Sequence, residues 1–207
     1  LPKHDLEALI PVVEGTKPLV IDVHRASDIR TLLELKKEFN LNIIIVGGAE
    51  AWMVADELAA VNVPVILDPM YNLPGNFDRL GARMDAASLL HNAGVKLIFT
   101  TLTTSHNPFL VRQSAGNAVA HGLPSAEALM AMTINPAEIF GIDDRFGSIE
   151  EGKVADLVIW DGDPLELLTR AKTVIINGEL IPMVSRSSRL RERYRNLKDT
   201  TPYIYRK

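Results

Sequence analysis

Hydrophobic residues along the first two thirds of the chain fall into short continuous runs, and each run is followed by a longer segment with helical spacing. The runs lie at residues 19–23, 41–48, 63–69 and 95–101. Runs of this length, rich in Ile, Val and Leu, predict strands that are covered on both faces. The segments with helical spacing predict helices at 5–13, 26–39, 49–61, 80–92, 107–121, 124–132 and 136–140.

The strands and helices alternate, which predicts an α/β fold with a parallel sheet covered by helices. Four such units make half of an eight-unit barrel, and a complete barrel needs about 250 residues. An open doubly wound sheet is the alternative. Its usual glycine-rich phosphate loop is missing, because only Gly47 and Gly48 stand together at a strand end. Ser27 or Asp28 is expected to cap the helix at 26–39.

Turn residues occur at short intervals after residue 142, and the segments ADLVIW and KTVIINGELI are typical of strands. The Asn177-Gly178 pair within the second segment predicts a hairpin. We therefore divide the chain into a helix-and-strand region at 1–142, a small β element at 143–184 and a basic segment at 185–207. The basic segment is expected to be a solvated helix and tail, or an arm that binds a partner.

The composition narrows the classes of protein to consider. Hydrophobic residues make up 47% of the 207 residues, enough for a sizeable core. A net charge of −4 gives no sign of a nucleic-acid-binding face, and no apolar run is long enough for a membrane span. The chain has no cysteine, hence no disulfide or thiolate ligand, which suits the cytoplasm and is compatible with the periplasm. Because it begins without Met, we expect a fragment or a processed product.

Two motifs mark the transition to the β element. The first is TINPAEIFG at residues 133–141, and the second is GSIEEGKVADLV at 147–158. Together they resemble the C-terminal end of the amidohydrolase superfamily, most closely its imidazolonepropionase-like branch. The resemblance implies the C-terminal half of a TIM-like (β/α)8 metal-dependent hydrolase barrel, strands 5 to 8 with their helices, followed by a small β-sandwich element.

These motifs predict structure rather than catalysis. Gly147 and Gly152 suit turns. Asn135 is expected to cap a helix that begins near Pro136. Asp156 precedes an apolar strand and is expected to accept hydrogen bonds from nearby backbone amides. They therefore identify a fold without establishing an activity.

The resemblance also implies a chemistry. Members of the superfamily hydrolyse carbon–nitrogen bonds, often in cyclic amides, with one or two divalent metals at the carboxyl ends of the barrel strands. Such a metal lowers the pKa of a bound water and polarises the scissile carbonyl. Imidazole ligands favour zinc or iron. The expected reaction is metal-assisted attack of water on a small-molecule substrate in the complete protein.

The family's ligand positions can be compared for three of these strands. At the first strand, residues 22–29 read DVHRASDI, which places Asp22 at the usual ligand histidine and His24 at a second histidine that is not a ligand. Gly47 stands where strand 6 has a histidine, and Leu102 stands where strand 8 has the aspartate that is also the general base. Asp22 and His24 remain candidate catalytic residues, and Asp22 is a candidate metal ligand.

Both candidates have alternatives. His24 lines a pocket, packs without a chemical role, or acts as a ligand or base. Asp22 binds a hard cation, or is buried and paired with Arg25 or Arg30. His106 follows the last strand and is a third catalytic candidate, expected at the mouth of the pocket.

Substrate contacts are expected from the loops. Arg25, Tyr71 and Asn72 are the candidate substrate-binding residues. Tyr71 and Asn72 lie with Phe77 in the long loop at 68–79, which is either a pocket wall or a surface loop. Four threonines near the last strand offer hydroxyl groups to a ligand, although β-propensity also explains them: Thr100, Thr101, Thr103 and Thr104. Asn107 is expected to start the helix that follows.

Three functions follow from this comparison. The first is a hydrolase whose site is completed by residues outside the chain. The second is a degenerate member that has lost the metal and acts as a structural or regulatory subunit, and the third is a ligand-binding module. Four strands leave two open edges and an uncovered inner face, which tend to pair with other protein. The expected partner is the missing N-terminal half of the barrel or another chain, in an oligomer.

Overall fold

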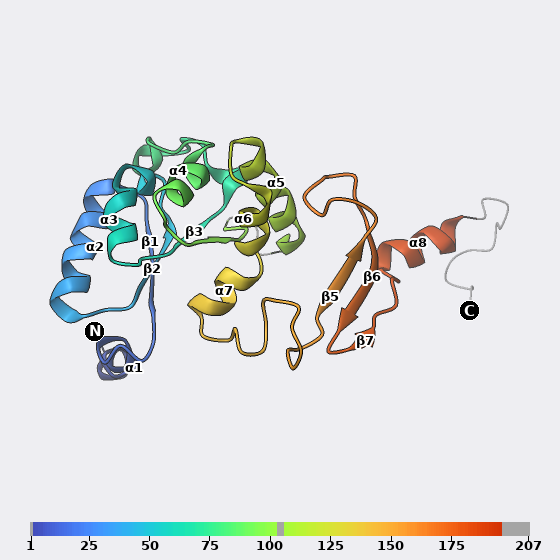
Figure 1. Cartoon of the computed structure of the whole chain (residues 1–207), viewed down its shortest axis with the longest axis horizontal. Coiled ribbons are helices and arrows are strands. Elements are labelled where there is room, and N and C mark those ends of the chain that lie inside the picture. Colours follow the sequence, from blue (N-terminus) through green and yellow to red (C-terminus); the bar gives the residue numbers. More distant parts are fainter. Residues whose placement is uncertain (1, 103–105, 196–207) are drawn as a thin grey trace.

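The computed structural model describes residues 2–102 and 106–195. Along the chain they form a parallel sheet with helices, a separate antiparallel sheet, and a C-terminal helix that extends from the second sheet (Figure 1). Among the described residues, no helix is both long enough and apolar enough to cross a membrane.

The first sheet contains four strands. They are β1 (Leu19–Val23), β2 (Ile43–Gly47), β3 (Val65–Leu67) and β4 (Leu97–Phe99). All neighbours are parallel, and the order in the sheet is the order in the chain. This confirms the predicted α/β fold. A doubly wound sheet reverses its strand order at a switch point, so the unreversed order is consistent with part of a barrel.

Helices cover one face of this sheet (Figure 1). They are α2 (Ala26–Phe39), α3 (Ala55–Ala60), α4 (Ala86–Asn92), α5 (Val111–Ala120) and α6 (Ser125–Met130). Helix α7 (Ile134–Ile139) packs on the opposite face, and α1 (Lys3–Val13), which precedes β1, has no buried residue. Single 3-10 turns lie between them: η1 (Ala51–Val54), η2 (Pro69–Tyr71), η3 (Phe77–Arg79) and η4 (Pro108–Leu110). The helix predicted over 80–92 begins only at Ala86. The preceding turn is held by a 2.8 Å hydrogen bond from the Trp52 indole to the Gly81 carbonyl.

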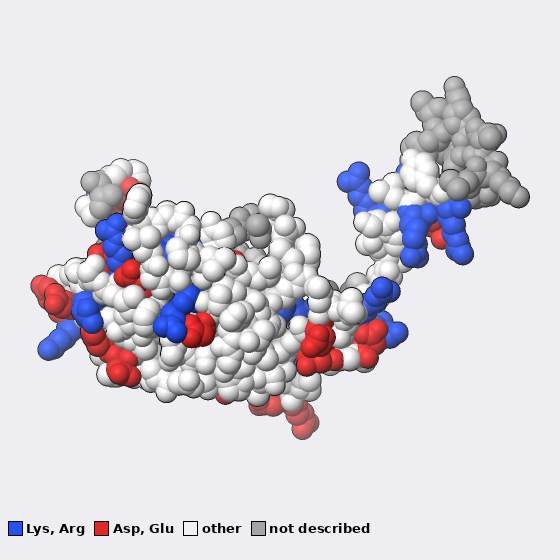
Figure 2. Space-filling model, turned by 90° about the horizontal axis from the view of Figure 1, so that it is seen from above, with Lys and Arg blue, Asp and Glu red and all other residues white. Residues whose placement is uncertain are grey.

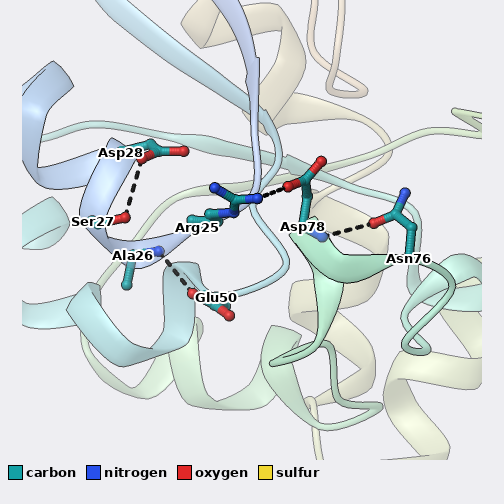
Figure 3. Close-up of polar contacts among 7 residues, drawn as sticks. All are labelled: Arg25, Ala26, Ser27, Asp28, Glu50, Asn76 and Asp78. Carbon is teal, nitrogen blue, oxygen red and sulfur yellow. Dashed lines mark hydrogen bonds and ion pairs between the residues drawn. The ribbon is translucent and has the colours of Figure 1, made fainter.

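The start of α2 is capped from outside the helix. Ser27 donates to the neighbouring Asp28 side chain, so neither residue caps α2 as the sequence predicted. Instead the Glu50 carboxylate, after β2, accepts a 2.9 Å hydrogen bond from the Ala26 amide (Figure 3). A carboxylate there also suits the positive end of the helix dipole. The cap thus joins two consecutive βα units.

Side chains alternate across the sheet, so each face has its own core. The face under the helices contributes Ile43, Ile45, Val65, Leu67, Leu97 and Phe99. The opposite face carries Ile44, Ile66 and Ile98, all less than 10% exposed, with Ile139 of α7 packed against them. The expectation of an uncovered inner face is therefore wrong for these three isoleucines.

The two edges of the sheet differ. At β4 the Phe99 amide donates to the Ala131 carbonyl at 2.9 Å, and the Asn135 side chain donates to the Leu97 carbonyl at 3.0 Å. Asn135 therefore ties α7 to β4 and does not cap α7, whose first flanking residue is Thr133. At β1 the outward residue Val20 is 47% exposed. Two open edges were expected, but the β4 edge is occupied by the chain itself.

The second sheet confirms the predicted β element. Strands β5 (Leu157–Trp160), β6 (Ala171–Ile176) and β7 (Glu179–Leu180) form an antiparallel meander. Asn177 and Gly178 both have positive φ, 51° and 81°, as the predicted hairpin turn requires. The Asp156 carboxylate accepts a 2.7 Å hydrogen bond from the Asn177 amide, as expected.

The C-terminal helix α8 (Arg186–Tyr194) has no buried residue. Ser185 and Ser188 form a reciprocal capping box at its start. Figure 2 shows Lys and Arg side chains gathered on this projecting part of the molecule. Residues 196–207, the rest of the predicted basic segment, lie outside the described residues.

Candidate functional site

The carboxyl ends of the four parallel strands bring several polar side chains to one end of the sheet, which we call the rim. Asp22 and His24 come from β1, Gly47 ends β2, and Asp68 follows β3. The loop at 69–79 adds further side chains. Parallel strands carry their ligand sites at this end, so the rim is the place to look for chemistry.

His24 lies directly over Gly47. A β-carbon built on Gly47 would lie 2.3 Å from His24 Cε1 and 2.8 Å from His24 Nδ1. Gly47 also has a φ of +86°, which disfavours other residues. The imidazole thus fills the space that any side chain at position 47 would need. His24 in this position therefore requires a glycine at position 47, where the family has a histidine.

The environment of His24 favours its neutral form. Burial of the imidazole, and then the nearby positive charge of Arg79, lowers the pKa of His24 below 6.5, while Asp22 and Asp78 oppose this. Its Nε2 lies 3.4 Å from Asp22 Oδ1. Its Nδ1 is buried and has no hydrogen-bond partner among the described residues. The Asp22 carboxylate therefore favours the tautomer with the proton on Nε2.

Asp22 is not the buried, arginine-paired residue considered from the sequence. Its side chain is 75% exposed, because β1 lies at the open edge of the sheet. Arg30 pairs instead with Glu57 on α3, at 2.9 Å. Arg25 pairs with Asp78. Asp22 therefore presents a carboxylate to the rim, and His24 is its one side-chain partner among the described residues.

The Arg25–Asp78 ion pair connects the end of β1 to the loop after β3 (Figure 3). Asp78 is held in place by its own loop, since its backbone amide donates to the Asn76 side chain at 3.1 Å. Both partners of the pair are about half exposed. The positive charge of Arg25 is thus neutralised within the rim.

Arg79, one residue further on, was not singled out from the sequence. It is 8% exposed. Its guanidinium lies 4.3 Å from the centre of the Tyr71 ring, and its Nη2 donates to the Tyr71 carbonyl at 2.9 Å. Its Nε is buried without a hydrogen-bond partner among the described residues. No sequence pattern distinguishes it, because only the folded loop buries it.

Asp68 is a second rim residue that sequence analysis missed. Its buried carboxylate accepts hydrogen bonds from Ser114 Oγ at 2.7 Å, the Leu102 amide at 3.1 Å and the Met70 amide at 3.2 Å. It therefore joins β3, the end of β4 and α5. A lone Asp closing a buried strand, in VILDP, was the available signal.

The remaining predicted residues are dispersed. Tyr71 is about half exposed and stacks on Arg79. Asn72 is buried, and its side chain donates to the Arg83 carbonyl, so it holds the loop. Phe77 is exposed, and so is His106, which makes no contact with Asp22 or His24 among the described residues.

Two of the four threonines near the last strand lie within the described residues. Thr100 and Thr101 are partly buried after β4, whereas Thr103 and Thr104 lie outside the described residues. Asn107 flanks η4 without a side-chain hydrogen bond to it. The predicted helix start at Asn107 is therefore a 3-10 turn, and α5 begins at Val111.

The donor set does not fit a metal by itself. Within residues 2–102 and 106–195, no three His, Asp or Glu side chains gather closely enough to hold an ion. Asp22 and His24 are two neighbouring donors, whereas a catalytic zinc site has three protein ligands. The nearby Arg79 charge also opposes a bound cation.

Comparison with known proteins identifies a family, a relative and solved structures that are similar to this chain. The sequence profile of the Amidohydrolase family matches residues 23–181. An imidazolonepropionase from Sphingopyxis alaskensis is 42% identical over 77 residues, covering 33% of this chain and 19% of that protein. The crystal structure of an amidohydrolase from Thermotoga maritima superposes with a TM-score of 0.79 at 30% identity, covering 88% of this chain and 48% of that one.

A further structure shares the fold at lower identity. It is an adenosine deaminase from Xanthomonas campestris with bound zinc, with a TM-score of 0.60 at 20% identity, covering 96% of this chain and 54% of that one. The chain thus spans about half the length of these two solved structures and a smaller share of the imidazolonepropionase.

Proposed function

Because the chain belongs to the amidohydrolase family, we propose that it acts in an assembly that hydrolyses a non-peptide carbon–nitrogen bond of a small molecule. The observation that carries the proposal is the rim itself, where Asp22, His24 and Arg79 meet at the carboxyl ends of parallel strands. In this proposal the chain binds and orients the substrate. The divalent metal that the family generally uses is held mainly by residues outside the described chain.

We assign each rim residue a role that its environment supports. Arg79 supplies a fixed positive charge, and Tyr71 supplies an aromatic surface next to it. His24 has its Nδ1 buried over Gly47, which suits a wall of the pocket better than a proton acceptor. Asp22 is an exposed rim carboxylate that, unlike Asp78, is not paired with an arginine among the described residues, and it is the residue we assign to accept a proton.

The two edge strands of the parallel sheet, β1 and β4, indicate where a partner would bind. The open edge of β1 suits a further βα unit, and the apolar face of α1, with Leu6, Leu9 and Ile10 exposed, offers it a second contact surface. We propose that the rest of a barrel, as part of the same protein or as another chain, adds at this edge. The β4 edge is less suited, since Ala131 and Asn135 already occupy it.

The proposal is tested on the native assembly that contains this chain, purified without chelator. Release of carboxylate and amine from a panel of cyclic amides and N-acyl amines is measured. Asp22→Asn should lower kcat by roughly 100-fold or more, as expected for loss of a general base, with little change in KM. Arg83→Met, which lies outside the rim, is the control. An assembly that cleaves none of these bonds, or an Asp22→Asn variant with full activity, would refute it.

A second candidate function is supported by His24 and Gly47. The imidazole fills the space that a side chain at position 47 would need, as expected of a site that has been rebuilt away from metal chemistry. In that case the chain is a degenerate member that binds a small molecule as a regulatory subunit. It would then bind ligands at the rim without any hydrolysis in the native assembly.

A further inference from the structure

Helix α8 lies away from both hydrophobic cores. It has no buried residue, and Figures 1 and 2 show it projecting beyond the second sheet. Its start is stabilised by its own residues, since Ser185 and Ser188 form the reciprocal capping box. The helix therefore keeps its shape without packing on the rest of the described chain and leaves its surface open to a partner.

The basic segment at 185–207 has a charge opposite to that of the rest of the chain. It contains eight Lys and Arg residues and two Asp and Glu residues, whereas residues 1–184 contain 14 and 24. Within residues 2–102 and 106–195, the side chains of Arg186, Arg189 and Arg191 have no ion-pair or hydrogen-bond partner. Their charge is thus not neutralised by this part of the chain, and it suits an anionic partner.

Two apolar side chains form a narrow stripe along α8. Leu190 and Tyr194 are four residues apart, which makes them neighbours on one face, and they are 36% and 55% exposed. At about 3.6 residues per turn, Arg186 and Arg191 fall on the two sides of this stripe. Glu192 is two residues from each apolar residue and falls on the opposite face. The helix thus presents an apolar centre with positive charge on both sides.

This arrangement distinguishes between the classes of anionic partner. A nucleic acid is bound by cations that face its phosphates, whereas here the arginines flank an apolar centre. A helix-binding groove of another protein takes a series of apolar anchors over two turns, and within α8 only Leu190 and Tyr194 are available. An anionic bilayer surface accepts a short apolar face, while arginines beside it reach the headgroups. Clusters of about four to eight Lys or Arg on such a helix are typical of anionic-lipid recognition.

We propose that the basic segment binds the surface of a membrane that contains anionic lipids. Leu190 and Tyr194 enter the headgroup region, and the arginines beside them contact the headgroups. Met183 and Val184, 54% and 57% exposed just before the capping box, add apolar contacts. Because the rest of the chain is acidic, the same surface repels it, and the contact is confined to the projecting segment (Figure 1).

This contact is peripheral and requires no membrane-spanning helix. It goes beyond the proposed function and does not depend on it, because none of its residues belongs to the rim.

The test is flotation of the 207-residue chain with lipid vesicles, which separates vesicle-bound protein from aggregates. Vesicles of phosphatidylcholine with about one quarter phosphatidylserine are compared with vesicles of phosphatidylcholine alone. The chain should float only with the first, and raising the salt from about 0.1 M to about 0.5 M should release most of it. Equal flotation with both kinds of vesicle, or flotation with neither, would overturn the proposal.

Paired substitutions assign the charge to α8. Arg186→Gln combined with Arg191→Gln should weaken vesicle binding about tenfold or more, because each arginine near an anionic surface contributes to binding. The matched control is Lys17→Gln combined with Lys37→Gln, which removes the same charge from two exposed lysines of the acidic part. It should bind vesicles as the parent does. Equal weakening by the two pairs would refute a site on α8.

The apolar stripe distinguishes a bilayer from a polyanion. Leu190→Ser should weaken vesicle binding about threefold or more, because Leu190 leaves water on binding. Leu168→Ser, at a position that is 90% exposed and lies outside α8, is the control and should have no effect. The competitor is polyuridylate, a single-stranded RNA. Full vesicle binding by Leu190→Ser, or release of the chain from vesicles by polyuridylate at equal charge concentration, would contradict a membrane partner.

Discussion

At the scale of single residues, the contact between His24 and Gly47 is the distinctive feature of the rim. The glycine permits both a left-handed backbone and the close approach of the imidazole. In the sequence, position 47 was noted as part of a glycine pair at a strand end and as a missing histidine. The space is filled by His24, which lies two residues beyond the expected ligand position at Asp22. This placement depends on the pairing of β1 with β2, so neither segment alone predicts it.

Gly47→Ala should therefore be strongly destabilising. The backbone strain of a left-handed alanine costs about 1–2 kcal/mol, and displacing His24 adds about 1–3 kcal/mol. Gly152→Ala is the matched control, because Gly152 has a similar φ of +90° and open space around its missing β-carbon. Urea unfolding of both variants measures the difference. Equal losses would contradict the contact, and adding His24→Ala to Gly47→Ala should recover the steric part.

His24 also makes a prediction about pH. Because its pKa is lowered on folding, the unfolded chain binds more protons than the folded one below about pH 6.5. The free energy of unfolding should thus be fully retained above that pH and should fall as the pH drops through 6.5 toward the lowered pKa. Urea unfolding of chelator-treated protein between pH 7.5 and about pH 5 measures this slope. His24→Gln should reduce the slope, and an unchanged slope would contradict a neutral His24.

The burial of Arg79 could not be predicted from the sequence. Arg25, Tyr71 and Asn72 were proposed as substrate contacts because they lie in the segments that follow predicted strands. The structure commits Arg25 to Asp78 and Asn72 to the Arg83 carbonyl. It buries Arg79 instead. Burial of a loop arginine depends on how η2 and η3 fold together, which residue type and spacing do not encode.

At the scale of secondary structure, the strands and most of the helices between them were predictable, and the side-chain contacts that join these elements were not. Continuous runs of Ile, Val and Leu gave the four parallel strands, and the Asn177-Gly178 pair gave the hairpin between β6 and β7. The cap of α2 was missed because Glu50 lies beyond the next strand. The role of Asn135 was missed because its partner, the Leu97 carbonyl, is 38 residues away.

Asp68 joins the carboxyl ends of β3 and β4 to α5 by accepting three hydrogen bonds. Asp68→Ala would leave the Leu102 and Met70 amides and the Ser114 hydroxyl without their shared acceptor. The expected loss is about 3 kcal/mol of unfolding free energy. Asp163→Ala, which removes a surface acceptor for the Leu165 amide, should cost less than about 1 kcal/mol. Chemical denaturation tests both, and comparable losses would contradict a linking role for Asp68.

At the scale of the whole molecule, β1 is an open edge strand, and α1, which lies before the amino end of β1, presents an apolar surface (Figure 1). Its exposed side chains are Leu6, Leu9, Ile10 and Val13, spaced as one face of a helix. An apolar helix face next to unpaired strand edges favours association. The sequence predicted open edges on both sides, and the structure leaves this one open, since the β4 edge bonds to Asn135 of α7 and to Ala131, the residue that follows α6.

The isolated 207-residue chain should accordingly self-associate through α1. The double substitution Leu6→Glu and Ile10→Glu should shift it toward monomer in analytical ultracentrifugation, because it places charge in the apolar face. Leu168→Glu is the control, since Leu168 is 90% exposed but isolated from this face. A parent chain that is already monodisperse and monomeric, or equal effects of both variants, would contradict this surface.

The central claim is that this amidohydrolase-family chain supplies the substrate-facing wall of a site and not its metal-ligand set. The most direct measurement is the zinc content of the purified chain by elemental analysis, after incubation with zinc and removal of the excess. The account predicts far less than one zinc per folded chain, unchanged by Asp22→Ala. One tightly held zinc per chain, lost on Asp22→Ala, would contradict it.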